Sequence, residues 1–344
     1  MKIGVLTGGG DCPGLNAVIR AVARKAFSNG DEVFGFYDGW KGAMEGKGDW
    51  LTHKNVSGIL HRGGTILGTS RTNPYKSEGG EAKIRDTFKK LGIDALVAIG
   101  GEDTLGVATK LAAAGFPVVG VPKTIDNDLN GTDVTFGFDT AINIAMEAID
   151  RIHTTAESHN RVMVVEVMGR HAGWIALYSG LAGGADVILI PEKPFDLDEV
   201  CELIKKRHAR GKSFSIVVAS EGAKVDSSKD DSFVVQAKEV DEFGHVRLGG
   251  IGNLLAGEIE HRTGFETRAT ILGHIQRGGS PTAADRVLGS RYGVFAYDLV
   301  TKKEWGKMAA LRGQNIVAVD IKDATKELKT VDLDLFKVAE VFFG

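Results

Sequence analysis

Short apolar runs, each followed at once by glycine and polar residues, restrict how this chain can fold. The runs are four to six residues long and rich in valine, isoleucine and alanine, as strands buried on both faces are. Stretches with a helical period separate them, so the sequence predicts parallel sheets built from βαβ units. The expected strands are 3–6, 95–99, 118–121, 162–167, 187–190, 215–219, 269–272 and 316–319, and the expected helices are 15–27, 104–114, 140–158, 197–207 and 283–300.

The polar turns after these strands predict a phosphate site. Glycine accounts for 46 of the 344 residues, and it clusters in the turns. Ligands of open parallel sheets bind outside the carboxyl ends of strands, and backbone amides at a glycine turn before a helix attract anions. A tight turn alone would also explain Gly8 to Gly10. We expect one extended site from the turns beginning at Thr7, Gly100, Pro122, Met168, Ser220 and Gly273.

Two carboxylates, Glu102 and Asp103, follow Gly100-Gly101 in a loop that should otherwise attract phosphate. One interpretation is that a carboxylate holds Mg²⁺, which bridges phosphate oxygens. The other is that Asp103 caps a helix with Glu102 alongside. The sequence of this loop leaves the two interpretations equally open.

The stretch Thr124 to Asp128 carries two more carboxylates, Asp126 and Asp128, directly after an apolar strand and beside Lys123. Phosphoryl transfer needs a group that accepts the proton of the attacking hydroxyl and cations that neutralise the phosphoryl group. An aspartate with an unperturbed pKa near ~3.9 is ionised at neutral pH and can accept that proton. The alternative is an Asx-type turn without a catalytic role.

Arginine and histidine side chains near other strand ends favour a dianionic ligand. Arginine offers a planar donor fork suited to phosphate, and histidine adds a titratable donor. Each arginine alone is more often a surface residue than a ligand. The set comprises Arg161, Arg170, Arg268, His274 and Arg277.

Bulk properties exclude several classes of protein. A net charge of −3, without a polybasic tract, argues against nucleic-acid and membrane-surface binding. The two cysteines, Cys12 and Cys201, are far apart, so we expect neither a disulfide framework nor a zinc cluster, and a reducing compartment fits best. The first residues lack the features of a signal peptide, and no apolar run approaches the ~20 residues of a membrane span. We therefore expect a cytoplasmic protein. The charged segment Lys224 to Val246 is expected to be a surface insertion without an assigned role.

Seven blocks of the sequence resemble the 6-phosphofructokinase family, in family order from Gly8 to Arg286. They are GGGDCPGLNAVIR, GGTILGTSR, GGEDT, PKTIDND, VEVMGRHAGW, SEGA and RATILGHIQRGGSPTAADR. The resemblance implies two Rossmann-like, three-layer α/β domains with mainly parallel sheets and an active site in the cleft between them. It further implies a donor domain of residues 1–138 and 276–326 and a sugar-phosphate domain of residues 139–275 and 327–344.

The resemblance also implies a role for each matching residue. Asp126 would be the general base acting on the sugar's 1-hydroxyl, supported by Asp128, and Glu102 would be the Mg²⁺-associated acid. Gly10 would contact the donor phosphates, and Arg71 and Lys123 would neutralise the donor. Fructose 6-phosphate would be held by Thr124, Met168, Gly169, Arg170, Glu221, His274 and Arg277, with Arg161 and Arg268 reaching the site of a neighbouring subunit. A complete site would then need a homodimer or homotetramer.

Asp103 points to the phosphoryl donor. ATP-dependent members of the family commonly have glycine at this position, and often at that of Lys123, whereas the pyrophosphate-dependent members resemble this chain at both. A carboxylate adds bulk and negative charge where the α-phosphate of a nucleotide would lie, and like-charge contacts cost several kcal/mol. We expect reversible, Mg²⁺-dependent transfer from pyrophosphate to fructose 6-phosphate, a step of glycolysis and gluconeogenesis. ATP as donor, sedoheptulose 7-phosphate as acceptor, and a non-catalytic sugar-phosphate or nucleotide sensor remain alternatives.

Overall fold

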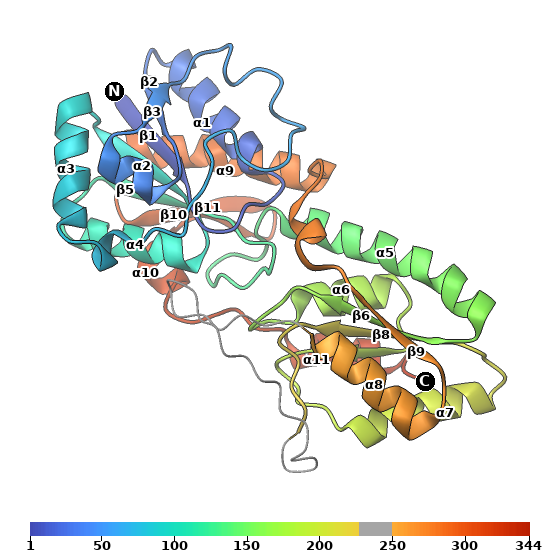
Figure 1. The fold of residues 1–344 in the computed structure, drawn as a ribbon. Coiled ribbons are helices and arrows are strands. Elements are labelled where there is room, and N and C mark those ends of the chain that lie inside the picture. Colours follow the sequence, from blue (N-terminus) through green and yellow to red (C-terminus); the bar gives the residue numbers. More distant parts are fainter. Residues whose placement is uncertain (227–249) are drawn as a thin grey trace. The chain divides into compact units, whose positions relative to one another are not determined.

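The computed structural model describes residues 1–226 and 250–344, which form two compact units (Figure 1). Unit 1 comprises residues 1–140 and 277–328, and unit 2 comprises residues 141–226, 250–276 and 329–344. Within the described residues the chain passes between units after Thr140, Gln276 and Leu328. The insertion expected at Lys224 to Val246 lies almost wholly outside the described residues.

The described part of unit 1 contains a seven-stranded sheet in the order β11-β10-β5-β4-β1-β2-β3. The five strands between the two edges are parallel, and the edge strands β3 and β11 run antiparallel to their neighbours. The turns after β1, β4 and β5 therefore lie at one edge of the sheet. The strands are β1 Lys2–Thr7, β2 Glu32–Phe36, β3 Gly48–Trp50, β4 Ala95–Gly100, β5 Val118–Pro122, β10 Lys307–Arg312 and β11 Asn315–Asp320.

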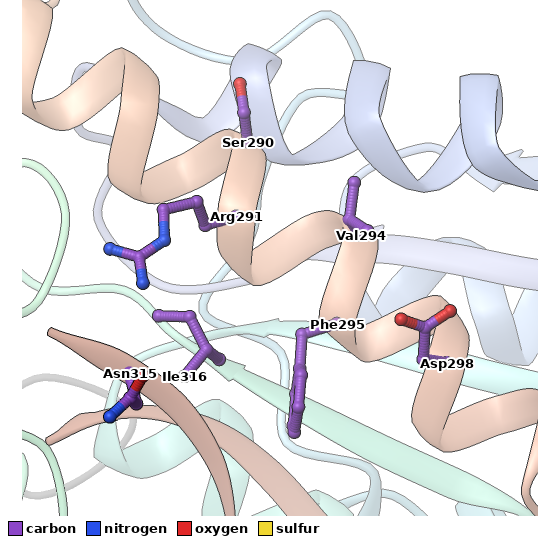
Figure 2. A pocket seen from close by; sticks show the side chains of 7 residues that line it. All are labelled: Ser290, Arg291, Val294, Phe295, Asp298, Asn315 and Ile316. Atoms are coloured by element: carbon purple, nitrogen blue, oxygen red, sulfur yellow. The ribbon is translucent and has the colours of Figure 1, made fainter.

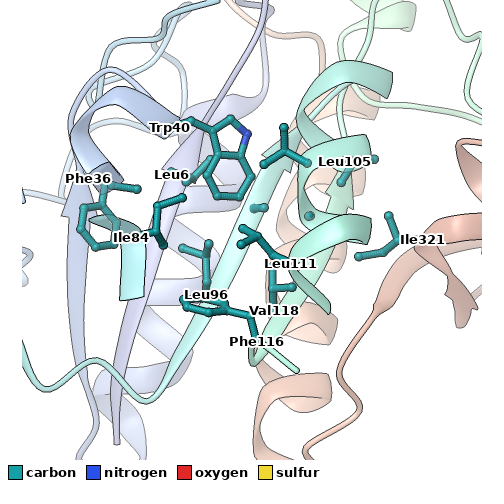
Figure 3. Packing of buried hydrophobic residues seen from close by; sticks show 14 of the residues in the cluster. Leu6, Phe36, Trp40, Ile84, Leu96, Leu105, Leu111, Phe116, Val118 and Ile321 are labelled. Carbon is teal, nitrogen blue, oxygen red and sulfur yellow. The ribbon is translucent and has the colours of Figure 1, made fainter. Parts of the chain in front are cut away.

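Helices cover both faces of this sheet (Figure 1). On one face α1 and α9 pack against each other. On the other face α2, α3, α4 and α10 cover an apolar core that includes Leu6, Trp40, Leu96, Leu105 and Phe116 (Figure 3). Fully burying each large apolar side chain stabilises the fold by roughly 1.5–3 kcal/mol, which anchors the strands whose ends carry the polar turns. The helices are α1 Leu15–Ser28, α2 Trp40–Glu45, α3 Gly80–Leu91, α4 Glu102–Ala113, α9 Ala283–Thr301 and α10 Ile321–Ala324, with a 3-10 helix at Pro74–Lys76.

The described part of unit 2 contains a four-stranded parallel sheet in the order β7-β8-β6-β9. Its helices α7 and α8 share a buried apolar core with the strands, and α6 packs on β7, β8 and α11. The strands are β6 Val162–Val167, β7 Val187–Leu189, β8 Ser215–Ser220 and β9 Thr267–Ile271. The helices are α5 Phe138–His159, which begins in unit 1, α6 Trp174–Ala182, α7 Leu197–Ala209, α8 Ile251–Thr263 and α11 Leu333–Glu340, with a 3-10 helix at Gly273–Arg277.

The predicted fold class of two α/β domains with mainly parallel sheets is confirmed. Every strand and helix expected from the sequence is present, with ends shifted by a few residues. The sequence did not predict several further elements, among them β2, β3, β10, α3, α6 and α8.

Candidate active site

In the first glycine turn of unit 1, side chains at Gly8 and Gly10 would meet neighbouring side chains. A Cβ on Gly8 would lie 2.4 Å from Thr104 Oγ1, and one on Gly10 would lie 2.5 Å from Arg277 Nη1. Gly9 has a φ of 77°, a conformation that glycine adopts without strain. The Gly8 amide donates to Ile99 O at 3.0 Å, so this turn is tied to the end of β4.

Arg71 and Arg277 both lie beside this turn. Gly9 N donates to the carbonyl of Ser70, the residue before Arg71, at 3.4 Å, and the Arg71 side chain is exposed. Arg277 Nη1 donates to Asp11 O at 3.4 Å, with its guanidinium against Gly10. Arg277, which is expected to hold the sugar phosphate, thus contacts Gly10 in the turn that is expected to hold the donor.

The acidic pair opens helix α4 and does not lie in a loop, which corrects the sequence interpretation. Glu102 and Asp103 are the first two helical residues, and Glu102 is exposed while Asp103 is half-buried. The N-cap residue is Gly101, and no side chain caps the helix there. Asp103 is therefore not the N-cap residue, although it lies in the first turn of the helix. Negative charge near the first turn is favoured by the helix dipole, and the α4 amides can also attract an anion.

Lys123 carries its charge into the interior of unit 1. It is 4% exposed, and its Nζ donates to Gly10 O. Burial, followed by repulsion from Arg277, lowers the pKa of Lys123 below its usual value of 10.5, against the attraction of Cys12 and Asp126. Its backbone N donates to Gly100 O at 2.9 Å. Lys123 therefore contacts the turn after β1 through its side chain and the end of β4 through its backbone.

The turn after β5 has two faces. Thr124, Asp126 and Asp128 are half-buried on one face, while Ile125 and Asn127 are buried behind it. The Asp126 amide donates to Thr124 Oγ1 at 3.1 Å. Burial is the main cause that raises the pKa of Asp128, and the nearby Glu102 carboxylate raises it further, while a hydrogen bond to Thr124 acts in the opposite sense. Asp128 and Glu102 are thus close enough to repel, and a cation beside them would relieve that repulsion.

The described residues are suited to a Mg²⁺ ion that takes only part of its ligands from the protein. Magnesium prefers oxygen ligands and is often held by one or two carboxylates together with substrate phosphates. Within residues 1–226 and 250–344, no group of three or more His, Cys, Asp or Glu side chains is arranged to hold a metal. Glu102 and Asp128 each carry a carboxylate, the ligand type that Mg²⁺ prefers. The site is therefore compatible with an ion that is completed by phosphate oxygens, and not with a closed protein cage.

Unit 2 brings most of the expected sugar-phosphate residues to one edge of its sheet. Met168, Gly169 and Arg170 follow β6, Glu221 follows β8, and His274 follows β9. Because β8, β6 and β9 are parallel neighbours, their carboxyl ends are adjacent. Glu221 N donates to Val167 O at 2.8 Å, and Met168 N donates to Gln276 Oε1 at 3.3 Å. Gln276, which the sequence did not single out, is fully buried and links the turn after β6 to the helix that carries His274.

Arg161 and Arg268 lie at the opposite edge of the same sheet. Arg161 precedes β6, and Arg268 is the second residue of β9 and pairs in register with Met163. The six residues of β6 span about 20 Å at ~3.3 Å per residue. Both guanidinium groups contact the exposed Glu266, at 2.7 Å from Arg161 and 2.6 Å from Arg268. Within one unit 2, these two arginines are therefore remote from Arg170 and His274.

A surface cavity of about 400 Å³ in unit 1 lies between α9 and β11, and it contains none of the predicted site residues (Figure 2). Val294, Phe295 and Ile316 make its lining mainly apolar, with Arg291 and Asp298 at its sides. Such a lining does not suit pyrophosphate. Separately, none of the helices in the described parts of the chain has the length and apolar character needed to cross a bilayer.

Comparisons with known proteins agree with the motifs. The phosphofructokinase family model matches residues 2–300. Proteins named pyrophosphate–fructose 6-phosphate 1-phosphotransferase from Amycolatopsis methanolica and Streptomyces coelicolor are 59% and 60% identical, over 100% of both chains in each pair. A protein named ATP-dependent 6-phosphofructokinase 3, also from S. coelicolor, is 55% identical over 96% of both chains.

Solved structures show the same fold. A phosphofructokinase from Saccharomyces cerevisiae superposes with a TM-score of 0.81 at 32% identity, covering 99% of this chain and 46% of that one. A pyrophosphate-dependent phosphofructokinase from Nitrosospira multiformis superposes with a TM-score of 0.83 at 21% identity, covering 100% of this chain and 92% of the other. With the family model spanning most of its length and full-length relatives near 60% identity, this chain belongs to the phosphofructokinase family.

Proposed function

We propose that this chain is a pyrophosphate-dependent 6-phosphofructokinase, which transfers a phosphoryl group from pyrophosphate to the 1-hydroxyl of fructose 6-phosphate and yields fructose 1,6-bisphosphate and phosphate. The observation that carries the donor assignment is the half-buried Asp103 carboxylate in the first turn of α4, beside glycine turns that are otherwise suited to phosphate. The names of the relatives at 59% and 60% identity support the assignment.

Unit 1 would bind the donor. Gly10 and the first turn of α4 offer backbone amides, while Lys123 and Arg71 supply positive charge to the transferring phosphoryl group. Glu102 would hold Mg²⁺, with Asp128 as its second carboxylate. Bound Mg²⁺ would neutralise the charge on the pyrophosphate oxygens.

The residues that would bind the acceptor are Thr124, Met168, Gly169, Arg170, Glu221, His274 and Arg277. Asp126 would accept the proton of the 1-hydroxyl as that oxygen bonds to phosphorus. The bond from phosphorus to the bridging oxygen of pyrophosphate breaks, and inorganic phosphate leaves. Asp126 then releases its proton to water. The reaction runs readily in both directions because pyrophosphate is a weaker driving donor than ATP in the cell.

A homo-oligomer would account for the separation of Arg161 and Arg268 from the other sugar-phosphate residues, because both arginines would then contact the substrate of a neighbouring subunit. A cytoplasmic setting is in keeping with two buried free thiols, Cys12 and Cys201. The proposed reaction would be a step of glycolysis and gluconeogenesis.

A donor comparison tests the proposal. Formation of fructose 1,6-bisphosphate would be measured with Mg²⁺ and either pyrophosphate or ATP at equal concentrations, and again after chelation of Mg²⁺. We expect turnover with pyrophosphate and Mg²⁺ only. Faster turnover with ATP would favour the activity in the name of the relative at 55% identity, which is the second candidate. A preference for sedoheptulose 7-phosphate would change the acceptor, and binding of sugar phosphate without turnover would indicate a sensor.

A further inference from the structure

Asn127, between Asp126 and Asp128, has a backbone conformation that most side chains avoid. Its φ is 52°, in the left-handed region, and its side chain is 3% exposed. Non-glycine residues in that region cost of order 1–3 kcal/mol, although asparagine tolerates it better than most. Such a conformation persists only where the surrounding contacts determine it. The turn therefore needs a local restraint on Asn127.

Thr135 supplies that restraint from behind the turn. Its backbone N donates to Asn127 Oδ1 at 3.1 Å, and its hydroxyl donates to Thr124 O at 2.8 Å. The hydroxyl oxygen also lies 3.4 Å from Asn127 Oδ1, a longer contact than that to Thr124 O. Thr135 is fully buried, so water does not compete for these groups. One residue thus fixes the turn at Thr124 and at Asn127, on either side of Asp126.

The segment that carries Thr135 is itself anchored. Tyr292 OH donates to Val134 O at 2.7 Å and lies 2.8 Å from Thr132 Oγ1, and Leu311 N donates to the same hydroxyl at 2.9 Å. The next residue, Phe136, pairs with Lys123. Thr135 is therefore held by α9 and β10 on one side and by the end of β5 on the other. It can transmit the rigidity of these elements to the turn.

We propose that Asn127 and Thr135 are positioning residues for phosphoryl transfer: their buried hydrogen bonds fix the left-handed turn and so hold Asp126 and Asp128 on the substrate side. The inference rests on the proposed role of Asp126 as general base. Neither Asn127 nor Thr135 lies on the half-buried face itself, so each acts through the turn. Misplacing a reacting group by about 1 Å can cost on the order of 10²-fold in rate.

The test compares Thr135→Val with Thr135→Ser. Valine keeps the shape but removes the hydroxyl donor, whereas serine retains it. We expect Thr135→Val to lower kcat with pyrophosphate by about 10- to 100-fold while both KM values change by less than about 3-fold. Thr135→Ser should keep kcat within about 3-fold of the unchanged protein, because the bond to Thr124 O can still form. A smaller effect of valine, or an equal loss in both variants, overturns the proposal.

A second pair of variants keeps the test decisive if Thr135→Val does not fold. Asn127→Gly allows the positive φ but removes the amide oxygen that Thr135 N contacts. Its control is Lys303→Gly, since Lys303 has a φ of 57°, is exposed and lies after α9 in the same unit. We expect Asn127→Gly to lose kcat by about 10-fold or more and Lys303→Gly to retain it. Equal kcat in these two variants would overturn the proposal. Inactivity of the unchanged protein would instead reject the proposed function.

Discussion

At the scale of one residue, the proposed preference for pyrophosphate rests on Asp103 in the first turn of α4. We expect Asp103→Gly to raise kcat/KM for ATP by about 10-fold or more, because removal of a carboxylate that faces a nucleotide phosphate recovers part of a like-charge cost of several kcal/mol. Turnover with each donor would be measured over a range of concentrations.

The variant Asp103→Asn is the matched control, because it keeps the size and removes only the charge. A higher kcat/KM for ATP in both variants would assign the donor selectivity to the charge of Asp103. A higher kcat/KM for ATP in Asp103→Gly alone would assign it to the size of the side chain. If neither variant gains with ATP, Asp103 does not select the donor.

Lys123 should contribute to activity at the expense of stability. Burial is the main cause that lowers the pKa of Lys123 in the folded state. At a pH below that pKa the buried lysine is charged, and its burial then reduces the free energy of unfolding. We expect Lys123→Met to lose at least about 100-fold in kcat with pyrophosphate, yet to have an unchanged or higher Tm without ligand.

The sign of the pH dependence provides the check. The unfolded state binds the proton of Lys123 more tightly, so the penalty is complete below the folded-state pKa and disappears as the pH rises towards 10.5. Any excess in the Tm of the methionine variant should therefore shrink between neutral and alkaline pH. A large loss of Tm at neutral pH would show that the lysine stabilises the fold.

Candidate site residues were predicted from the sequence where a strand-end motif carried their chemistry. The placement of Lys123, Asp126 and Asp128 after β5 agrees with the apolar run before them. Thr135 and Gln276 were not predicted, because a buried threonine or glutamine leaves no periodic pattern in the sequence. Its structural role depends on the backbone groups with which its side chain forms hydrogen bonds. The backbone partners of these two side chains, Thr124 O and Met168 N, are 11 and 108 positions away in the sequence.

At the scale of elements, Asp285 connects the beginnings of α5 and α9. Its carboxylate accepts from Gly137 N at 2.9 Å and from Thr140 N at 2.8 Å, and from Thr140 Oγ1 at 2.5 Å. We expect Asp285→Asn to reduce the free energy of unfolding by about 2 kcal/mol, because the new amide group would face a backbone donor in the interior. Chemical denaturation would measure the loss.

Asp298→Asn is the control for that experiment. Asp298 is on the same helix, is 40% exposed and lies 4.0 Å from Lys25 Nζ. Its substitution should change the free energy of unfolding by no more than about 0.5 kcal/mol. A comparable loss in both variants would mean that Asp285 acts only through its charge on α9.

The fold was predictable to the extent that the elements carry a local pattern. The buried strands of the two sheets, such as β4 and β6, are continuous apolar runs and were found. β3 has only three residues, and β10 contains no β-branched residue, so neither carries a local strand signal. Both are strands because they pair with neighbours in the sheet, β3 with β2 and β10 with β5. Helix α6 is apolar around most of its surface, which removes the amphipathic period that identified α1.

At the scale of the whole molecule, the separation of Arg161 from Arg170 predicts complementation between subunits. We expect Asp126→Ser and Arg161→Ala each to lose most turnover. If Arg161 serves a neighbour, mixed oligomers contain sites with an intact base from one chain and an intact arginine from the other. Random pairing of equal amounts in a dimer would restore about a quarter of the sites.

The measurement is turnover after co-expression of the two variants, with each variant alone and a mixture of Asp126→Ser and Asp126→Ala as controls. The control mixture lacks a base in every site and should stay inactive. Absence of recovery in the first mixture, in oligomers shown to be hybrid, would mean that Arg161 serves its own chain or no site.

The division of both units into separate chain segments has a consequence for synthesis on the ribosome. Unit 1 obtains α9, β10 and β11 from residues 277–328, and unit 2 obtains α11 from residues after Leu328. When residue 276 leaves the exit tunnel, β5 still lacks its neighbour β10, and α1 lacks the helix that packs on it. Unit 1 therefore cannot be finished before residues 277–328 are made, and unit 2 cannot be finished before α11 is made. Nascent chains that stall within α9 should expose apolar surface and be substrates for chaperones.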